Sequence, residues 1–308
     1  MSKKVLITGG AGFIGSHIAE EIIKSKKAEV IILDNLTVGK KDNIQTGCEF
    51  IQGDIKDRKK LIDIFKDVDI VFHNAAFVSI RGSFEKIRET VDNNFVGTLN
   101  VLEAAKENHV KKIIFASSMD VYGEPQYLPV NEEHPLNTKS PYGMSKITGE
   151  LFCKIFEEKY GIKSVVLRYF NTYGTRQTPS DYVGVITIFI NKALKGEPLT
   201  VYGDGNQTRD YVWVKDIAQA NILAAFSNTT GIFNIGSGQE LSVNQIADMI
   251  ISRIGGEKVY LKKPLGEINR MVADISKAKR ILEYAPKGKL EMILPDLIDW
   301  CKQKMKFI

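Results

Sequence analysis

A glycine-rich segment near the N-terminus constrains the fold of this chain more than any other feature of its sequence. Gly9, Gly12 and Gly15 lie between an apolar run at Lys4–Thr8 and a segment from Phe13 onward with apolar residues at helical spacing. A strand, a tight turn and a helix in this order let the backbone approach a pyrophosphate, which the helix N-terminus then faces. The pattern predicts the first unit of a doubly wound parallel sheet, with a dinucleotide at the turn.

The next apolar run indicates which dinucleotide is bound. Glu29–Leu33 is typical of a second buried strand, and Asp34 follows it directly. A carboxylate at this place accepts hydrogen bonds from a ribose 2′-hydroxyl and repels a 2′-phosphate. Aspartate also ends strands in ordinary turns, so the inference depends on the strand and the glycine turn together. The two features in register predict NAD rather than NADP.

A serine, a tyrosine and a lysine are candidates for acid–base chemistry beside that cofactor. Tyr142 and Lys146 lie one turn apart at the start of a helix predicted from Pro141 to Tyr160. An ammonium stabilises a phenolate, so we expect Lys146 to lower the pKa of Tyr142 from its ordinary value of about 10. Ser118 follows the apolar run Lys112–Ala116, at the edge where parallel sheets bind ligands. Each feature alone is common on helix surfaces or in turns, so they are informative only as a set.

The spacing of apolar residues predicts an α/β fold, with a doubly wound parallel sheet followed by a smaller α/β region. In the first part, strands are expected over Cys48–Gln52, Asp69–His73 and Ser164–Leu167, and helices over Lys59–Phe65, Ile87–Asn108 and Met144–Tyr160. After Arg168, helices are expected over Val183–Leu194, Asp216–Ser227, Val243–Ile254, Ser276–Leu282 and Met292–Lys304. We therefore predict an NAD-binding domain at 1–170 and, mainly at 171–308, a substrate domain.

Composition argues against several classes of function. The net charge of +5 is mild and the lysines are scattered, so no nucleic-acid partner is expected. No apolar run approaches membrane-spanning length, and the N-terminus shows no signal-peptide pattern. Cys48, Cys153 and Cys301 are widely spaced, which favours reduced thiols in a cytoplasmic protein. The four histidines lack metal-ligand spacing, so no metal is expected.

Motifs along nearly the whole chain resemble those of the extended short-chain dehydrogenase/reductase family, and within it the UDP-hexose 4-epimerases. Besides the residues above, the resemblance rests on Asp34-Asn35-Leu36, Gly53-Asp54-Ile55, His73-Asn74-Ala75-Ala76, Asn94 to Thr98, Val121-Tyr122-Gly123, Arg168 to Asn171, Gly203-Asp204-Gly205, Arg209 to Val212 and Ala273 to Ala278.

The resemblance implies a Rossmann fold to which the chain returns near 212–226. It implies NAD bound by Gly9, Gly12, Phe13, Ile14, Gly15, Asp34, Asn35, Asp54, Ile55, Ala75, Ala76, Asn94, Tyr142 and Lys146. It implies catalysis by Ser118, Tyr142 and Lys146, and a UDP-sugar held by Ser118, Tyr142, Asn171, Tyr202, Arg209 and Met271. The implied reaction interconverts UDP-glucose and UDP-galactose, or their N-acetyl forms, through a 4-keto sugar. A homodimer formed through the two long predicted helices is also implied.

The chain departs from the epimerase pattern at three places. Pro264 stands where these enzymes usually carry an arginine, two residues before Gly266-Glu267, which leaves one diphosphate contact open. Met271 stands where a large or small side chain excludes or admits an N-acetyl group, and its intermediate size leaves that substituent open. Met119-Asp120 follows Ser118, where epimerases more often carry small or hydroxylated residues.

These departures keep other functions open. UDP-glucuronate decarboxylases carry Glu where Asp120 stands, and they need a cation near carbon 6 of the sugar, for which Arg81 and Arg176 are candidates. A UDP-glucuronate 4-epimerase is a further alternative. So is a non-catalytic NAD-dependent regulator, although a regulator has no need of an intact base. Arg209 could instead pair with Asp210, and Tyr202 could be an ordinary strand aromatic.

Overall fold

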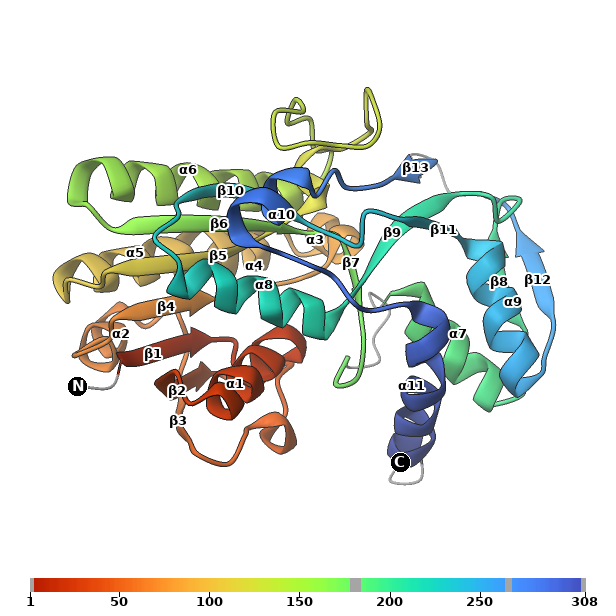
Figure 1. The fold of residues 1–308 in the computed structure, drawn as a ribbon, viewed down its shortest axis with the longest axis horizontal. Coiled ribbons are helices and arrows are strands. Elements are labelled where there is room, and N and C mark those ends of the chain that lie inside the picture. The colour runs from red at the N-terminus through yellow and green to blue at the C-terminus, as the bar shows by residue number, and fades with distance from the viewer. Residues whose placement is uncertain (1–2, 178–183, 264–267, 306–308) are drawn as a thin grey trace.

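A seven-stranded parallel sheet forms the centre of the first domain (Figure 1). The computed structural model describes residues 3–177, 184–263 and 268–305. Along the sheet the strand order is β10-β6-β5-β4-β1-β2-β3. The order reverses between β1 and β4, which is the topological switch point where α/β sheets bind ligands. The bounds are β1 Lys3–Thr8, β2 Ala28–Asp34, β3 Cys48–Gln52, β4 Ile70–His73, β5 Lys112–Ser118, β6 Lys163–Tyr169 and β10 Gly231–Ile235.

Helices cover both faces of this sheet. On one face α1 (Phe13–Ser25) packs against α8 (Val214–Phe226), and on the other α5 (Gly97–Glu107) packs between α2 (Arg58–Ile64) and α6 (Pro141–Tyr160). The strands alternate between the two cores, because side chains along a strand point to opposite faces. Burial on both faces explains why these strands are continuous apolar runs. The predicted α/β, Rossmann-type fold is confirmed.

The helix predicted over Ile87–Asn108 is not a regular α-helix. After the short α3 (Ile80–Glu85), α4 (Ile87–Thr90) leads into a π-helical turn, η2 (Val91–Val96), and then into α5. The backbone stays helical at both junctions. A π turn adds a residue without changing the residue types, so the apolar spacing did not predict it.

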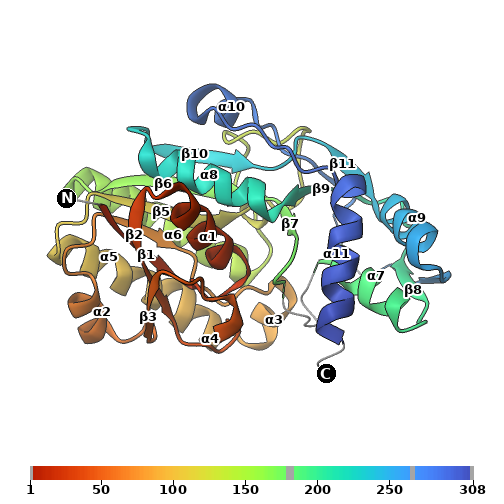
Figure 2. The same ribbon diagram turned by 60° about the horizontal axis from the view of Figure 1, so that its bottom comes forward.

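A smaller region lies beside the first domain (Figure 2). One small sheet contains β7 (Asn171–Tyr173), β9 (Thr208–Trp213), β11 (Glu240–Ser242) and β13 (Arg270–Met271), and β8 (Leu199–Tyr202) pairs with β12 (Lys258–Leu261). α7 (Val185–Leu194), α9 (Val243–Ile254) and α11 (Leu290–Met305) surround a separate apolar core. Val183, the first residue of one predicted helix, lies outside the described residues.

The chain returns to the first domain over a longer segment than the predicted 212–226. β9 belongs to the small sheet, α8 packs against α1, and β10 then pairs with β6 at the edge of the main sheet. After the small sheet, α10 (Ser276–Leu282) packs against β10 and α8. β10 was not predicted because a short apolar run does not distinguish a strand from a loop. Within the residues that the structure describes, no helix has the length and apolar character needed to cross a bilayer.

Candidate active site

The turn between β1 and α1 leaves space only for glycine at two of its positions. Gly9 has φ of 69°, and a Cβ there would lie 2.8 Å from the backbone nitrogen of Ala75. A Cβ on Gly15 would lie 2.3 Å from the carbonyl oxygen of Gly9. Gly12 is the N-cap residue of α1 and has no side chain to cap the helix. The amide groups of the first helical turn are therefore open to phosphate oxygens. The turn has the shape of a pyrophosphate cradle.

The residues predicted to hold the far end of NAD gather where β2 and β3 end. The carboxylate of Asp34 accepts hydrogen bonds from the backbone nitrogens of Ala11 and Leu36, at 3.0 and 2.8 Å. Burial raises the pKa of this carboxyl, and the two bonds oppose the shift. Asn35 donates to Asp54 at 3.1 Å, and Ile55 is buried after it. The structure therefore brings these residues together beside the glycine turn.

The loop after β4 is held by backbone and amide contacts. In the pair Ala75–Ala76, the backbone nitrogen of Ala75 donates to the Thr8 hydroxyl at 3.3 Å. The Asn94 oxygen accepts from the backbone nitrogen of Phe77 at 2.7 Å, and its nitrogen donates to the Phe77 carbonyl and the Ser145 hydroxyl, both at 3.0 Å. Asn94 thus ties the loop to α6, and its contact with NAD stays a prediction.

Ser118, Tyr142 and Lys146 meet at the carboxyl end of β5. Ser118 is the last residue of β5, and Tyr142 lies in the first turn of α6. The Ser118 hydroxyl lies close enough to the Tyr142 hydroxyl to lower the pKa of the tyrosine. Lys146 donates from Nζ to the carbonyl of Ala116 at 2.8 Å, and Nζ lies 5.7 Å from the centre of the Tyr142 ring. The structure therefore assembles the predicted acid–base set.

Burial dominates the ionisation of this set. It raises the pKa of Tyr142, and the Ser118 hydroxyl opposes the shift. It lowers the pKa of Lys146 to about 8, an effect that the charge of Glu150 opposes. The predicted lowering of the Tyr142 pKa by Lys146 is therefore wrong, because desolvation of the phenolate is the larger effect.

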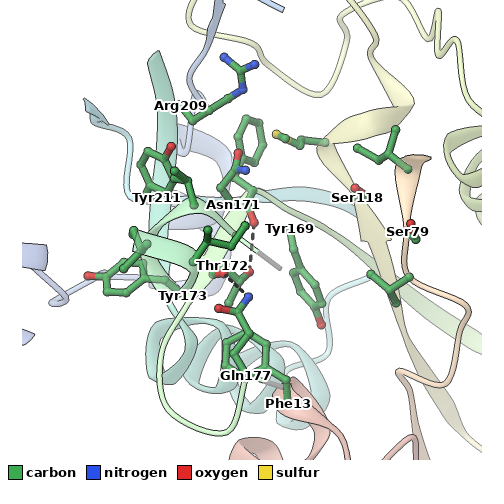
Figure 3. A pocket seen from close by; sticks show the side chains of 18 of the residues that line it. Phe13, Ser79, Ser118, Tyr169, Asn171, Thr172, Tyr173, Gln177, Arg209 and Tyr211 are labelled. Carbon is green, nitrogen blue, oxygen red and sulfur yellow. Dashed lines mark hydrogen bonds between the residues drawn. The ribbon is translucent and has the colours of Figure 1, made fainter. Parts of the chain in front are cut away.

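A cavity of about 770 Å³ extends from this set into the second region. Its volume lies in the range of small-molecule sites. Figure 3 shows Ser118 and Ser79 on one side and Arg209 and Tyr211 on the other, with Asn171 between them. The side-chain oxygen of Asn171 is buried and has no partner among the described residues. A ligand in this cavity would contact both regions.

The cavity has a positive lining. Arg81, Lys192 and Arg209 line it, whereas no aspartate or glutamate does so among the described residues. Lys192 donates to the Thr200 hydroxyl, and Arg209 donates to the carbonyl of Thr208 at 2.8 Å. Such a lining favours an anionic ligand, such as a nucleoside diphosphate.

The carboxylate of Asp210 is not engaged in the alternative ion pair with Arg209. It is fully buried and accepts hydrogen bonds from the backbone nitrogens of Ser237, Gly238 and Ala273 at 2.7, 2.9 and 3.2 Å. Arg209 lines the cavity, and so does Tyr202, which is 42% exposed. Their contacts with a substrate stay predictions.

Met271 does not contact the cavity, so its predicted role at the sugar is wrong. It is fully buried in the core of the first domain. The cause is the pairing of β13 with β9, which turns Met271 inward and leaves Arg270 at the surface beside Glu240. A strand of two residues has no pattern from which this orientation could be predicted.

Two further sequence candidates lie elsewhere. Arg176 forms an ion pair with Glu20 of α1 at 2.5 Å and does not line the cavity. Pro264 and Gly266-Glu267, the site of the missing arginine, lie outside the described residues.

Several cavity residues carry no recognisable signal in the sequence. They come from separate segments, and each is a residue type that packing alone would explain. They are Ser79, Gln177 and Lys192.

Comparison with known proteins identifies the family. Residues 5–236 match the model of the NAD dependent epimerase/dehydratase family. The chain belongs to this family. The resemblance to the extended short-chain dehydrogenase/reductases is confirmed.

Individual relatives cover almost the whole chain. A putative UDP-glucose 4-epimerase from Methanocaldococcus jannaschii is 47% identical over 97% of this chain and 98% of its own. A UDP-N-acetyl-alpha-D-glucosaminuronate decarboxylase from Bacillus cytotoxicus is 36% identical over 98% of this chain and 99% of its own. The solved UDP-N-acetylglucosamine 4-epimerase from Methanobrevibacter ruminantium, in complex with UDP-N-acetylmuramic acid, is 38% identical, with a TM-score of 0.94 over 99% of each chain.

NAD is the cofactor of this enzyme, as predicted. The shape and chemistry of the residues at the glycine turn and at the end of β2 are compatible with it, and their individual contacts with NAD stay predictions. The glycine turn leaves room for a pyrophosphate, and Asp34 stands at the end of β2 where an adenine ribose is recognised. Ser118, Tyr142 and Lys146 surround the place where the nicotinamide end of a dinucleotide would lie at the sheet edge.

Asp34→Ala is expected to narrow the preference for NAD over NADP. The substitution removes the carboxylate that repels a 2′-phosphate. The ratio of the two dissociation constants, measured by calorimetry, is the readout, because Asp34 also holds its turn and its loss weakens both cofactors. Asp63→Ala on the exposed face of α2 is the control and should leave the ratio unchanged. Tighter binding of NADP than of NAD by the unaltered protein would contradict the assignment of Asp34.

Proposed function

We propose that the protein epimerises a UDP-hexose at carbon 4 through a transient 4-keto sugar, with UDP-glucose and UDP-galactose as the reference pair. The main support for this proposal is the meeting of Ser118 and Tyr142, beside the buried Lys146, at one end of a cationic cavity. Two of the relatives described above are named as 4-epimerases of UDP-sugars, which supports the same reaction.

Each residue has a defined part in this reaction. Ser118 orients the 4-hydroxyl of the sugar, and Tyr142 accepts its proton and later returns it. NAD, which the glycine turn and Asp34 would hold, would supply the hydride acceptor for carbon 4 and the donor for the return of the hydride to the opposite face. Arg209 and Lys192 hold the diphosphate, so the keto sugar turns about a fixed link. Because hydride and proton both return, the reaction has no net redox change.

The surroundings of Asp120 favour epimerisation over decarboxylation. Its carboxylate does not line the cavity. It accepts hydrogen bonds from the hydroxyls of Ser140 and Thr138, the latter at 3.4 Å. Ser140 is the N-cap of α6, the helix that carries Tyr142. Asp120 is therefore a positioning residue at the start of that helix.

The backbone of Asp120 completes the arrangement. Its nitrogen donates to the Ser118 hydroxyl oxygen at 3.2 Å. One residue thus links the serine at the end of β5 to the helix that carries the tyrosine. A decarboxylase would instead need an acidic side chain at the sugar itself, and the carboxylate of Asp120 is already engaged by the start of α6.

An apolar patch on η2 and α6 supports a homodimer. Its residues are large, apolar and between 37% and 56% exposed, and they are Val91, Phe95, Met144, Leu151 and Ile155. Phe95 stacks edge-on with Phe152 of α6, at 5.2 Å between ring centres, which joins the two helices into one surface. Exposed apolar patches of this kind mark interfaces. We assign the patch to a second copy of this chain, in agreement with the resemblance.

A cytoplasmic location suits this enzyme. Cys48, Cys153 and Cys301 are free, and burial raises the pKa of each thiol, which keeps them protonated. Free thiols are typical of reducing compartments.

Tyr142→Phe is expected to lower the turnover of UDP-glucose by at least about 10²-fold while UDP-sugar binding is kept, because it removes only the proton acceptor. Conversion to UDP-galactose is followed by NMR. Tyr160→Phe, at the exposed end of α6, is the matched control and should keep full activity. Turnover of Tyr142→Phe near that of the control would remove Tyr142 from the mechanism.

Asp120→Asn is expected to leave the interconversion of UDP-glucose and UDP-galactose within about tenfold of the original rate, which is less than the usual loss of an acid–base group. The asparagine oxygen still accepts from Ser140. Asp120→Leu, which cannot accept a hydrogen bond, should lower kcat more than Asp120→Asn. Release of carbon dioxide and UDP-xylose from UDP-glucuronate, without interconversion of neutral hexoses, would overturn the epimerase proposal.

Light scattering at micromolar concentration should give twice the 34.5 kDa mass of the chain. Leu151→Asp places a charge in the apolar patch and should shift the protein toward monomer, whereas Lys154→Asp, on an exposed part of the same helix, should not. A monomer mass for the unaltered protein would contradict the dimer.

A further inference from the structure

Arg81 differs from the other cations of the cavity because no described residue neutralises it. It lies in the first turn of α3, is exposed, and lines the cavity. Among the described residues it has no hydrogen-bond or ion-pair partner, whereas Lys192 and Arg209 each donate to a neighbouring oxygen and Arg176 pairs with Glu20. Its guanidinium is therefore available to a ligand.

α3 lies at the catalytic end of the cavity. The hydroxyl of Ser83 accepts a hydrogen bond from the backbone nitrogen of Tyr142 at 3.2 Å, and α3 packs against α6. Figure 3 places Ser79, the N-cap of α3, on the same side as Ser118 and across from β9. Arg81 follows Ser79 by two positions and lines the same cavity, so we place it at the end of the cavity that holds Ser118 and Tyr142.

The charges of the cavity exceed what a neutral UDP-sugar needs. The diphosphate carries about two negative charges, which Lys192 and Arg209 match from α7 and β9. The third cation, Arg81, is at the other end, with no acidic side chain of the described residues lining the same cavity. A guanidinium remains charged at every physiological pH, and its planar donors match a carboxylate in a two-bond contact.

We propose that Arg81 recognises a carboxylate on the sugar, so that the preferred substrate is a UDP-hexuronate or another UDP-sugar with an acidic group at the same end. This inference rests on the proposed function and leaves the reaction unchanged. The hydride of carbon 4 and the proton of the 4-hydroxyl leave and return as described above. The carbon–carboxylate bond is neither formed nor broken.

The experiment compares kcat/KM for two pairs of substrates in the NAD-loaded protein. UDP-glucuronate and UDP-galacturonate form the acidic pair, and UDP-glucose and UDP-galactose form the neutral pair. The unaltered protein should favour the acidic pair by about tenfold or more, the range of a charge-assisted contact. Arg81→Gln should lower the ratio of acidic to neutral kcat/KM by about tenfold, mainly by raising KM for the acidic pair. Arg81→Lys, which keeps a positive charge, should retain part of the preference for the acidic pair. Arg88→Gln, an exposed arginine of α4 that does not line the cavity, should leave the ratio unchanged.

The possible failures are distinguishable. Equal loss for both pairs in Arg81→Gln would show that Arg81 binds a part common to all UDP-sugars, which overturns the inference. Interconversion of the neutral pair alone by the unaltered protein also overturns it and leaves the proposed function intact. If neither pair is interconverted, or if UDP-glucuronate loses carbon dioxide, the proposed function itself fails.

Discussion

A buried ion pair between Glu150 of α6 and Arg168 of β6 fixes the catalytic helix to the sheet. Nε and Nη2 of Arg168 donate to the two carboxylate oxygens at 2.9 and 2.6 Å, and both side chains are almost inaccessible to water. Desolvation of two charges is costly, so such a pair is stable only when its other polar groups are also bonded. Ser117 donates to Glu150 at 2.5 Å, and Arg168 donates to the Tyr122 hydroxyl at 2.9 Å. Because Ser117 adjoins Ser118 and Glu150 lies one turn beyond Lys146, this network determines where the proposed acid–base groups meet.

The second constraint is the way the chain joins the two regions. The cavity is lined by residues of both regions, so a shift between the main sheet and the small sheet would separate the groups that are proposed to hold one ligand. Asp210 opposes such a shift. From β9 of the small sheet, its buried carboxylate accepts hydrogen bonds from Ser237 after β10 of the main sheet, and from Ala273 after β13. Arg209 adjoins Asp210, so the proposed diphosphate contact lies next to the residue that ties the two sheets together.

The sequence predicted those parts of the site in which neighbours in the chain are also neighbours in space. Gly9 and Gly15 belong to one turn, and Tyr142 and Lys146 belong to one helical turn. Their spacing in the sequence therefore determines their relative positions in space. Met271 could not be placed in this way, because a partner strand far along the chain decides whether it faces the core or the cavity. The pKa of Tyr142 was also wrongly predicted, since burial depends on the whole fold. Arg81 was only one of two candidate cations until the structure paired the other with Glu20.

The burial of Tyr142 has a chemical consequence that links the fold to the reaction. A sugar hydroxyl is a very weak acid. A deprotonated base accepts the proton of this hydroxyl more readily when the pKa of its conjugate acid is higher. Burial raises the pKa of Tyr142, which makes its phenolate a stronger base but a rarer one at neutral pH. The Ser118 hydroxyl opposes this shift, and Lys146, with a pKa of about 8, remains mostly protonated at pH 7 within reach of the ring. A fully solvated tyrosine would ionise at lower pH and be a weaker base. The enclosed position of Tyr142, which the packing of α6 on the sheet determines, therefore makes its phenolate a stronger base toward an alcohol than a solvated phenolate would be.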